Sequence, residues 1–279
     1  MIFWTKQVSF PKKCLGYIYL IISRTKRNSY YKPSIDGLKL IPGSYERLVS
    51  LRNIHAGKRA FVLGTGPSLK TSDVNRLKNE IVFACNGIYK IYEELGWKPT
   101  YHTVIDRTQL EDRSSELNKL TGTTIFVPDF AGYCIKGRQN VIFLPFRWPD
   151  PTKYGYPKFS EDAAAAVWDG MTVTISNLQL AYHMGITEVI LLGIDFSYDL
   201  AKMLKDGETE LKGISSSPDH FIKDYYSGSK RFVNFYPDLQ KQSYELSNTV
   251  FAADSRKIIN ASRETKLEVF ERVDFDSLF

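Results

Sequence analysis

The sequence predicts an α/β protein with a Rossmann-like, doubly wound, mostly parallel sheet and an aromatic-rich lid region. Short runs of consecutive apolar residues recur along the chain, as in strands that helices cover on both faces. Stretches with helical spacing separate these runs, and such alternation is typical of parallel sheets. The first run also ends in a glycine-containing turn directly before a helix, the place where Rossmann-like folds bind phosphate.

The predicted elements follow one another in a regular order after a short helix over 44–51. Strands are expected at 60–63, 81–84, 101–105, 124–127, 141–144, 188–192 and 257–260, the last of them ending the sheet. Helices are expected at 69–78, 88–95, 106–120, 172–184 and 239–252. Each buried strand is thus followed by a helix or a loop long enough for a crossover connection.

We divide the chain into four segments. Residues 1–42 form a basic and apolar N-terminal arm with a linker, and residues 43–198 form a Rossmann-like nucleotide-binding domain. Residues 199–237 combine glycines, serines and many aromatics without clear periodicity, which indicates a lid or acceptor-binding loop. Residues 238–279 supply a helix and a strand that complete the domain.

The positive charge of the chain is concentrated at its start. The net charge is +6, and residues 1–27 contain six Lys and Arg but no acidic residue, so the remainder is neutral. A nucleic-acid-binding enzyme would spread positive charge over a surface, so we expect no nucleic acid partner. The nine apolar residues 14–22 are too few to span a bilayer. We expect a cytoplasmic protein with peripheral contact at the inner membrane face through residues 1–27; packing of this arm on the body is the alternative.

Cysteine usage argues against metal and disulfide frameworks. The chain has three cysteines, and no two of them form a CxxC pair. The sequence also lacks an HExxH motif and a nucleophile elbow, so hydrolysis by zinc or by a catalytic triad is not expected. We predict no metal site and a reducing compartment.

The glycine turn after the first strand is the clearest functional motif. It reads Gly64-Thr65-Gly66-Pro67-Ser68 and precedes a helix. Glycines allow the backbone to approach a phosphate, and a helix N-terminus offers unpaired N–H groups. The turn is neither a dinucleotide fingerprint nor a P-loop, because the third glycine and the Gly-Lys pair are absent. A tight strand-to-helix turn without a ligand is the alternative.

Polar residues follow three further strands. Asn86 comes after the second strand, Asp106 after the third, and Gly193 with Asp195 after the strand at 188–192. The carboxyl ends of parallel strands meet at one edge of a sheet, where ligands of open α/β folds bind. We expect these residues to share one crevice, although each carboxylate alone could simply cap a helix.

His220 is the candidate general base, with Tyr225 and Tyr226 close behind it. Histidine accepts a proton from a hydroxyl near neutral pH, and tyrosines can donate hydrogen bonds to a leaving phosphate. A histidine on a surface loop is the alternative. His102 lies within a predicted strand and His183 on a largely apolar helix, so both are weaker candidates.

These motifs resemble a known superfamily. The segments 57–69, 85–87 and 98–101, together with Asp106, look like the 6-hydroxymethylpterin diphosphokinase-like (MptE-like) domain. The Gly-Pro-Ser-Leu and Cys-Asn motifs also resemble bacterial CMP-sialic-acid-dependent sialyltransferases. That second resemblance covers roughly residues 58–226 and extends to Thr172, Gly185, Glu188 and 192–196.

The resemblance implies roles for individual residues. It implies that Gly64, Gly66, Pro67, Ser68 and Asn86 hold the nucleotide and that Asp195 lies near the cytidine or ribose. We also expect nucleotide contacts at Thr65, Asp106, Thr172 and Gly193. It implies that His220 is the general base and that Tyr198, Tyr225 and Tyr226 stabilise the leaving phosphate. One departure concerns Thr65, because those sialyltransferases have Asn between the two glycines, and this leaves the donor sugar or base open.

Three functions compete. The favoured one is a sialyltransferase-like glycosyltransferase in surface-glycan biosynthesis, which moves a sugar from a CMP-sugar to a glycan or small-molecule acceptor and needs no cofactor. The second is an MptE-like diphosphokinase that uses ATP, a pterin-like alcohol and Mg²⁺, with Asp106 and Asp195 as the metal ligands. The third is a nucleotide-binding relative without catalysis.

Overall fold

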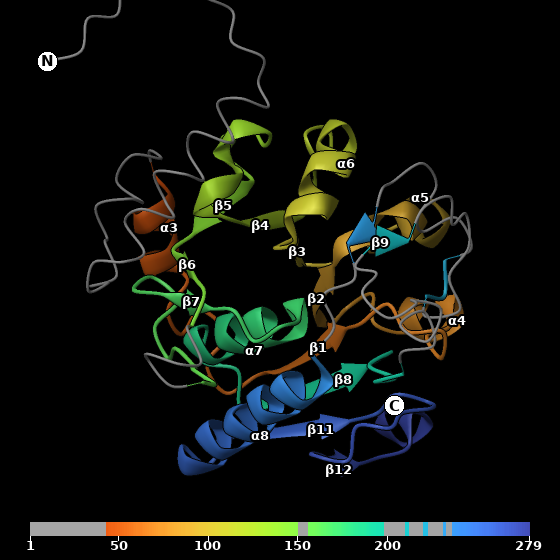
Figure 1. Cartoon of the computed structure of the whole chain (residues 1–279). Coiled ribbons are helices and arrows are strands. Elements are labelled where there is room, and N and C mark those ends of the chain that lie inside the picture. Colours follow the sequence, from red (N-terminus) through yellow and green to blue (C-terminus); the bar gives the residue numbers. More distant parts are fainter. Residues whose placement is uncertain (1–42, 150–155, 198–209, 212–219, 223–230, 233–235) are drawn as a thin grey trace, which may run out of the picture.

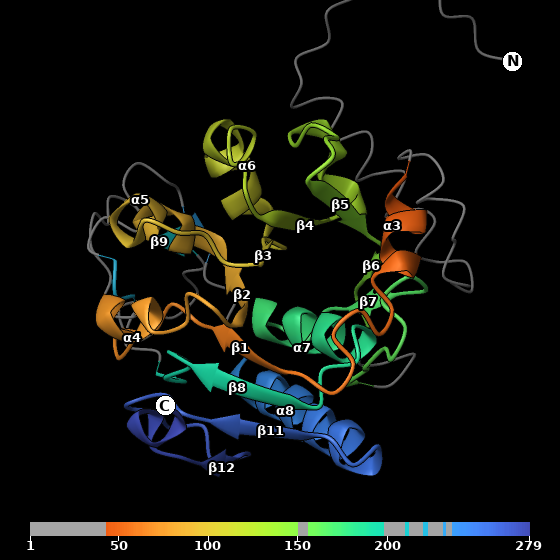
Figure 2. The same ribbon diagram turned by 180° about the vertical axis from the view of Figure 1, so that it is seen from behind.

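The computed structural model describes residues 43–149, 156–197, 210–211, 220–222, 231–232 and 236–279. Eight strands form one sheet in the order β12-β11-β8-β1-β2-β3-β4-β5. Every pair of neighbouring strands in this sheet runs parallel. Helices lie on both faces of the sheet (Figures 1 and 2). The prediction of a Rossmann-like α/β fold is therefore confirmed.

The elements have the following bounds. The main sheet contains β1 (Arg59–Leu63), β2 (Ile81–Cys85), β3 (Tyr101–Thr103), β4 (Thr124–Pro128), β5 (Val141–Leu144), β8 (Glu188–Leu192), β11 (Lys257–Asn260) and β12 (Glu271–Arg272). The α-helices are α3 (Ser44–Ser50), α4 (Thr71–Asn75), α5 (Tyr92–Leu95), α6 (Arg107–Leu117), α7 (Val173–His183) and α8 (Pro237–Ala253). The 3₁₀ helices are η1 (Asn86–Ile91), η2 (Asp129–Tyr133) and η4 (Phe275–Leu278). Two small ribbons pair β6 (Phe146–Arg147) with β7 (Val167–Trp168), and β9 (Glu210–Leu211) with β10 (Arg231–Phe232).

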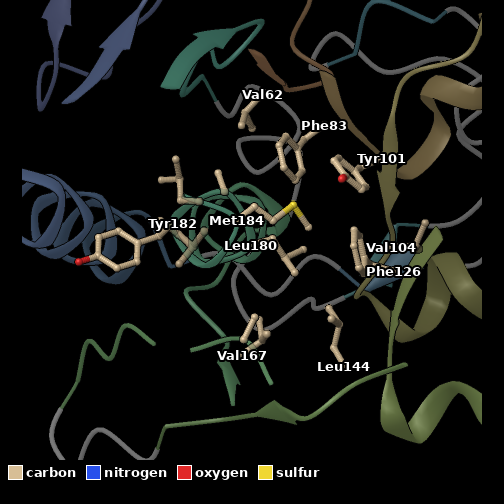
Figure 3. Packing of buried hydrophobic residues seen from close by; sticks show 14 of the residues in the cluster. Val62, Phe83, Tyr101, Val104, Phe126, Leu144, Val167, Leu180, Tyr182 and Met184 are labelled. Carbon is tan, nitrogen blue, oxygen red and sulfur yellow. The ribbon is translucent and has the colours of Figure 1, made fainter. Parts of the chain in front are cut away.

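The central strand β1 shows why the apolar runs are continuous. Successive side chains of a strand point to opposite faces, and Val62 belongs to the core cluster that contains Leu180 of α7. Its neighbour Phe61 belongs to a second cluster with Leu77, beyond α4, and with Phe275 of η4. Figure 3 shows α7 against Val62 and the adjoining strands. Both faces of β1 are thus buried, as the sequence pattern indicates.

The strand order places a topological switch point at β1. The chain moves from β1 to β2 on one side, and it later returns to β8 on the other side of β1. Crossovers therefore leave in opposite directions from this point, and ligands of open α/β folds bind beyond the carboxyl ends of the strands at such a point. The glycine turn and the Gly193–Asp195 segment lie directly there.

Several predicted bounds were wrong. The helix expected over 69–78 is confined to Thr71–Asn75, and the first half of the one expected over 88–95 is 3₁₀ helix. The strand at 257–260 is not the last one, because β12 pairs with β11 beyond it. The two-residue strands β6, β7 and β12 are too short for an apolar period to reveal them.

The four-segment division of the chain stays a prediction, because much of 199–237 and all of 1–42 lie outside the described residues. In the part of the chain that the structure describes, no helix has both the length and the apolar character needed to cross a membrane. The predicted membrane contact through residues 1–27 also falls outside the described residues.

Candidate functional site

The glycine turn lies against the end of β8. The N–H of Gly64 donates to the carbonyl of Leu192 at 2.8 Å, and the N–H of Gly66 donates to the carbonyl of Gly193 at 2.9 Å. A Cβ on Gly64 would lie 2.3 Å from the Gly193 oxygen, and a Cβ on Gly66 would lie 2.5 Å from Cγ of Asp195. Close approach of two strand ends thus requires both glycines, whether or not a phosphate binds.

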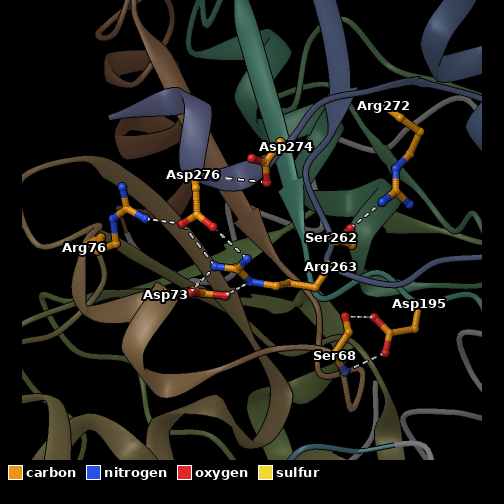
Figure 4. A network of polar contacts seen from close by, with 9 residues as sticks. All are labelled: Ser68, Asp73, Arg76, Asp195, Ser262, Arg263, Arg272, Asp274 and Asp276. Carbon is orange, nitrogen blue, oxygen red and sulfur yellow. Dashed lines mark hydrogen bonds and ion pairs between the residues drawn. The ribbon is translucent and has the colours of Figure 1, made fainter.

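Asp195 fixes the turn from the β8 side. Its carboxylate accepts hydrogen bonds from the N–H of Ser68, at 2.7 Å, and from the Ser68 hydroxyl (Figure 4). Burial raises the pKa of Asp195 above its ordinary value, and the two bonds from Ser68 oppose that shift. Both carboxylate oxygens therefore already have protein donors. A nucleotide contact by Asp195 stays a prediction.

His220 lies at the same turn although 155 residues separate it from Thr65. The His220 Nδ1 atom is 2.8 Å from the Thr65 hydroxyl and 3.4 Å from the Thr65 carbonyl oxygen. The N–H of Phe221 donates to the same carbonyl at 3.1 Å. The hydroxyl can donate to Nδ1 or accept from it, whereas the carbonyl can only accept; with the proton on Nδ1, the lone pair of the imidazole is on Nε2.

Asn86 follows β2 at the adjoining position of the carboxyl edge. Its backbone has a φ of 48°, in the left-handed region. Its side-chain oxygen is buried and has no hydrogen-bond partner among the described residues, while its carbonyl accepts from Nε2 of His102 at 3.1 Å. A buried acceptor without a partner costs about 1–3 kcal/mol. Such an atom suits a ligand or an ordered water that would supply the missing donor.

Asp106 and Thr172 both cap helices. The Asp106 carboxylate accepts from the N–H of Gln109 at the start of α6, at 2.8 Å. The Thr172 hydroxyl accepts from the N–H of Thr174 at the start of α7, at 3.4 Å. Asp106 follows β3 at the carboxyl edge of the sheet, as predicted, but capping explains both residues without a ligand. Their contact with a nucleotide stays a prediction.

Sequence reasoning missed Asp169, which lies between β7 and α7. Its carboxylate accepts from the N–H of Met171 at 2.8 Å. Burial and, secondarily, the negative charge of Asp106 raise the pKa of Asp169 to about 6. The Asp-Gly pair at 169–170 is an ordinary turn signal in the sequence, and only the fold brings this carboxylate to Asp106.

The remaining predicted residues divide into two groups. Pro67 is an exposed residue of the turn, whereas Tyr198, Tyr225 and Tyr226 lie outside the described residues. Over the ranges that the structure describes, no three His, Cys, Asp or Glu side chains form a group that could hold a metal ion.

The two weaker histidine candidates are structural. His102 is buried, its Nδ1 lies 2.7 Å from the hydroxyl of Tyr92, and burial lowers its pKa to about 4. His183 is buried in α7, and its Nε2 donates to the carbonyl of Leu48 at 2.8 Å. Both rings connect core elements, and His102 does so beside a candidate-site residue, because its Nε2 donates to the carbonyl of Asn86.

Comparison with known families assigns the chain. The model of the 6-hydroxymethylpterin diphosphokinase MptE-like family matches residues 38–200, which is more than half of the chain. The chain belongs to this family. The matched segment contains the glycine turn, Asn86, Asp106, Thr172 and Asp195 but ends before His220. A comparison with curated proteins finds no match for this MptE-like chain.

Comparison with solved structures gives matches of low identity. The Maf glycosyltransferase of Magnetospirillum magneticum AMB-1 is 13% identical with a TM-score of 0.49; the match covers 88% of this chain but 39% of that one. The Campylobacter jejuni sialyltransferase CstII, in complex with CMP-3FNeuAc, is 17% identical with a TM-score of 0.38 over 77% and 86% of the two chains. A mammalian sialyltransferase in complex with Gal-β-1-3GalNAc-ortho-nitrophenol is 15% identical with a TM-score of 0.42 over 94% and 92%.

Proposed function

We propose that this MptE-like protein is a glycosyltransferase that uses a nucleotide-activated sugar, with a CMP-sugar as the favoured donor and a glycan or small-molecule hydroxyl as the acceptor. The observation that carries the proposal is the hydrogen bond between His220 and Thr65. It joins a potential general base to the turn at the switch point of the sheet, where Rossmann-like folds bind nucleotides. The motif resemblance of the turn to CMP-sugar enzymes supports the choice of donor.

In the proposed reaction, Nε2 of His220 takes the proton of the acceptor hydroxyl as its oxygen attacks the anomeric carbon of the donor sugar. The bond from that carbon to the phosphate oxygen breaks, and the electron pair leaves with the nucleotide. Ser68 and Asn86 are proposed to contact the nucleotide, and Tyr198, Tyr225 and Tyr226 are proposed to donate to the departing phosphate. Neutral donors would take up this charge, so the scheme requires no metal ion.

Replacement of His220 tests the base. We expect His220→Ala to bind the donor nearly as well as the wild type and to lower turnover by about 10²–10⁴-fold. His55→Ala is the matched control, because His55 contacts the hydroxyl of Tyr101 at the start of β3, the opposite edge of the sheet. Steady-state transfer assays with both variants measure the effect. Equal turnover in all three proteins would remove His220 from the mechanism.

The nucleotide is identified by thermal stabilisation. A ligand that binds only the folded state raises the melting temperature, so CMP, CDP, UDP, GDP, ADP and ATP can be ranked directly. We expect the largest rise with CMP. A preference for ATP with magnesium would instead support diphosphate transfer, and nucleotide binding without consumption of any donor would support a non-catalytic relative.

The name of the family and the closeness of two carboxyl groups favour diphosphate transfer as the second candidate. Asp106 lies close enough to Asp169 for its charge to raise the pKa of that carboxyl group. The magnesium pair expected from the sequence, Asp106 with Asp195, stays a prediction; Ser68 donates to both oxygens of Asp195, so a metal ion would share these oxygens with Ser68. Activity that persists in EDTA would count against this candidate.

A further inference from the structure

An aromatic cluster lies on the carboxyl edge of the sheet, away from the glycine turn. Trp148, which follows β6, stacks on Phe130 of η2 with ring centroids 5.1 Å apart. The ring of Phe146 meets Trp148 edge-on at 5.2 Å. Even so, 39% of Trp148 is exposed. The indole therefore packs against two aromatic rings while part of it faces solvent.

A buried ion pair fixes the elements that carry these rings. Nη1 of Arg147 lies 2.8 Å from the carboxylate of Asp129, and both side chains are largely buried. The same nitrogen donates to the carbonyl of Phe146 at 2.7 Å. Arg147 thus connects β6, next to Trp148, to the first residue of η2. An aromatic surface held in one position binds a flat ligand with little loss of side-chain entropy.

A carboxylate lies beside this surface. In the β6–β7 ribbon Arg147 is paired with Trp168, so the next positions, Trp148 and Asp169, are neighbours. The N–H of Asp169 donates to the carbonyl of Arg147 at 2.7 Å, which extends the pairing to this point. Asp106 lies close enough to influence the charge of Asp169. The partly exposed Trp148 and the carboxylate-bearing Asp169 therefore occupy paired positions at the end of the ribbon.

We propose that Trp148 is a platform for a neutral pyranose ring of the acceptor and that Asp169 accepts hydrogen bonds from its hydroxyl groups. A pyranose presents C–H groups on one face, which suit the negative face of an indole, and donor hydroxyls around its rim. The two carboxylates disfavour phosphate and acidic sugars at the same place. That the ring belongs to the acceptor rests on the function proposed above.

The strand order sets the place of this platform relative to the turn. Phe130 follows β4, three strand positions from β1, and neighbouring strands lie about 4.8 Å apart. Roughly 14 Å therefore separates the platform from His220 along the edge, which is farther than one sugar ring spans. The platform holds a ring beyond the one that reacts, so the acceptor contains at least two sugar residues.

Saturation-transfer NMR on the full chain tests the platform. The probes are methyl β-galactoside, lactose, cellobiose and maltose, each with and without CMP. We expect at least one disaccharide to bind, more tightly than the monosaccharide, with the strongest transfer to its ring C–H protons. Trp148→Ala should lower affinity at least tenfold, while Trp148→Phe, which keeps a flat ring, should retain part of it.

Trp97→Ala is the matched control. Trp97 precedes β3, at the opposite edge of the sheet, and its indole N–H donates to Asn75. Saccharide binding that survives in Trp97→Ala but is lost in Trp148→Ala supports the platform. Equal binding in Trp148→Ala and wild type overturns it, as does the absence of saccharide binding under every condition. Loss of CMP binding in Trp148→Ala would also overturn it, because the ring would then hold a base.

The outcomes separate this inference from the proposed function. A chain that is stabilised by CMP and hydrolyses a CMP-sugar, yet binds no saccharide, keeps the proposed function and loses the platform. A chain that binds a disaccharide through Trp148 but is stabilised by no nucleotide keeps the platform and loses the proposed function.

Discussion

At the scale of single residues, Thr65 has the most specific contact in the candidate site. Its hydroxyl lies 2.8 Å from Nδ1 of His220. Its carbonyl accepts a hydrogen bond from the N–H of Phe221, the residue after His220. The sialyltransferases that the motif resembles have Asn here, so the motif alone gives no reason for threonine. The structure supplies one, since a short hydroxyl side chain orients the imidazole from the turn.

Removal of this hydroxyl should affect the reaction more than donor binding. Thr65→Val keeps the shape of the side chain, and we expect it to lower kcat about 10-fold, the effect of losing one hydrogen bond to a group that becomes charged. Thr65→Ser should restore most of the activity. The pH profile of kcat distinguishes a positioning role from a structural one, because the loss of the bond should shift its acidic limb. An unchanged profile in Thr65→Val would contradict that role.

Gly66 is required for packing as well as for any ligand. A methyl group there would meet the Asp195 carboxylate at 2.5 Å. We expect Gly66→Ala to lower the free energy of unfolding by about 1–3 kcal/mol, the usual cost of overpacking. Gly132→Ala is the control, because the nearest atom to a Cβ there is 4.0 Å away. Urea unfolding measures both. Equal midpoints for the two variants would show that the turn can move away from Asp195.

At the scale of elements, the N-terminus of α7 brings together Thr172, which the sequence marks, and Asp169, which it does not. Thr172 caps the helix. In the turn directly before it, the Asp169 carboxylate accepts a hydrogen bond from the N–H of Met171. Gly170 must lack a side chain, because a Cβ would lie 2.5 Å from Ile175. This tight entry explains how a carboxylate becomes buried near Asp106 and why its pKa rises.

The raised pKa of Asp169 makes stability depend on pH. Between its ordinary value of 3.8 and the raised value of about 6, the folded state binds more protons than the unfolded state. The free energy of unfolding contributed by this group therefore falls as the pH rises through that window, and the loss is complete above pH 6. Because Asp169 is partly exposed, we expect a loss of about 1–2 kcal/mol rather than the full value for two pKa units.

Asp169→Asn removes this titration and keeps a side-chain oxygen that can accept from Met171. At pH 7 we expect the free energy of unfolding of the variant to equal that of the wild type or to exceed it by up to about 1–2 kcal/mol. At pH 4 we expect the variant to be less stable than the wild type. Urea unfolding from pH 4 to pH 7.5 measures the difference. A difference that is constant over this range would show that the carboxyl group does not titrate abnormally.

At the scale of the whole molecule, periodicity and composition predict the core well and the site only in part. Strands such as 141–144 and 188–192 have the predicted bounds, because burial on both faces leaves a clear apolar run. The meeting of Ser68 with Asp195 follows from parallel strand ends, which strand-helix alternation indicates. The ring stack of Trp148 on Phe130 depends on the two-residue ribbon β6–β7, and no local pattern predicts such a ribbon.

The C-terminal segment completes the site although the family match ends at residue 200. Three hydrogen bonds join the loop after β11 to the end of β8. The N–H of Ile194 donates to the Ser262 hydroxyl at 2.9 Å, and the Thr265 hydroxyl donates to the Ile194 carbonyl at 2.6 Å. The N–H of Lys266 donates to the Asp195 carbonyl at 2.8 Å. Figure 4 shows Arg263 of this loop between Asp73 and Asp276.

This connection predicts that a distant hydroxyl affects nucleotide affinity. Thr265→Val removes the bond to Ile194 and the acceptor for the N–H of Leu267, so the backbone that leads into Asp195 loses support. We expect nucleotide affinity to fall about 5–10-fold, the equivalent of about one hydrogen bond. The rise in melting temperature with the preferred nucleotide measures it. The control is Thr249→Val, which removes an exposed hydroxyl bond within α8 and should bind the nucleotide as the wild type does. Equal nucleotide affinity in both variants would show that the loop supports the fold without influencing the nucleotide site.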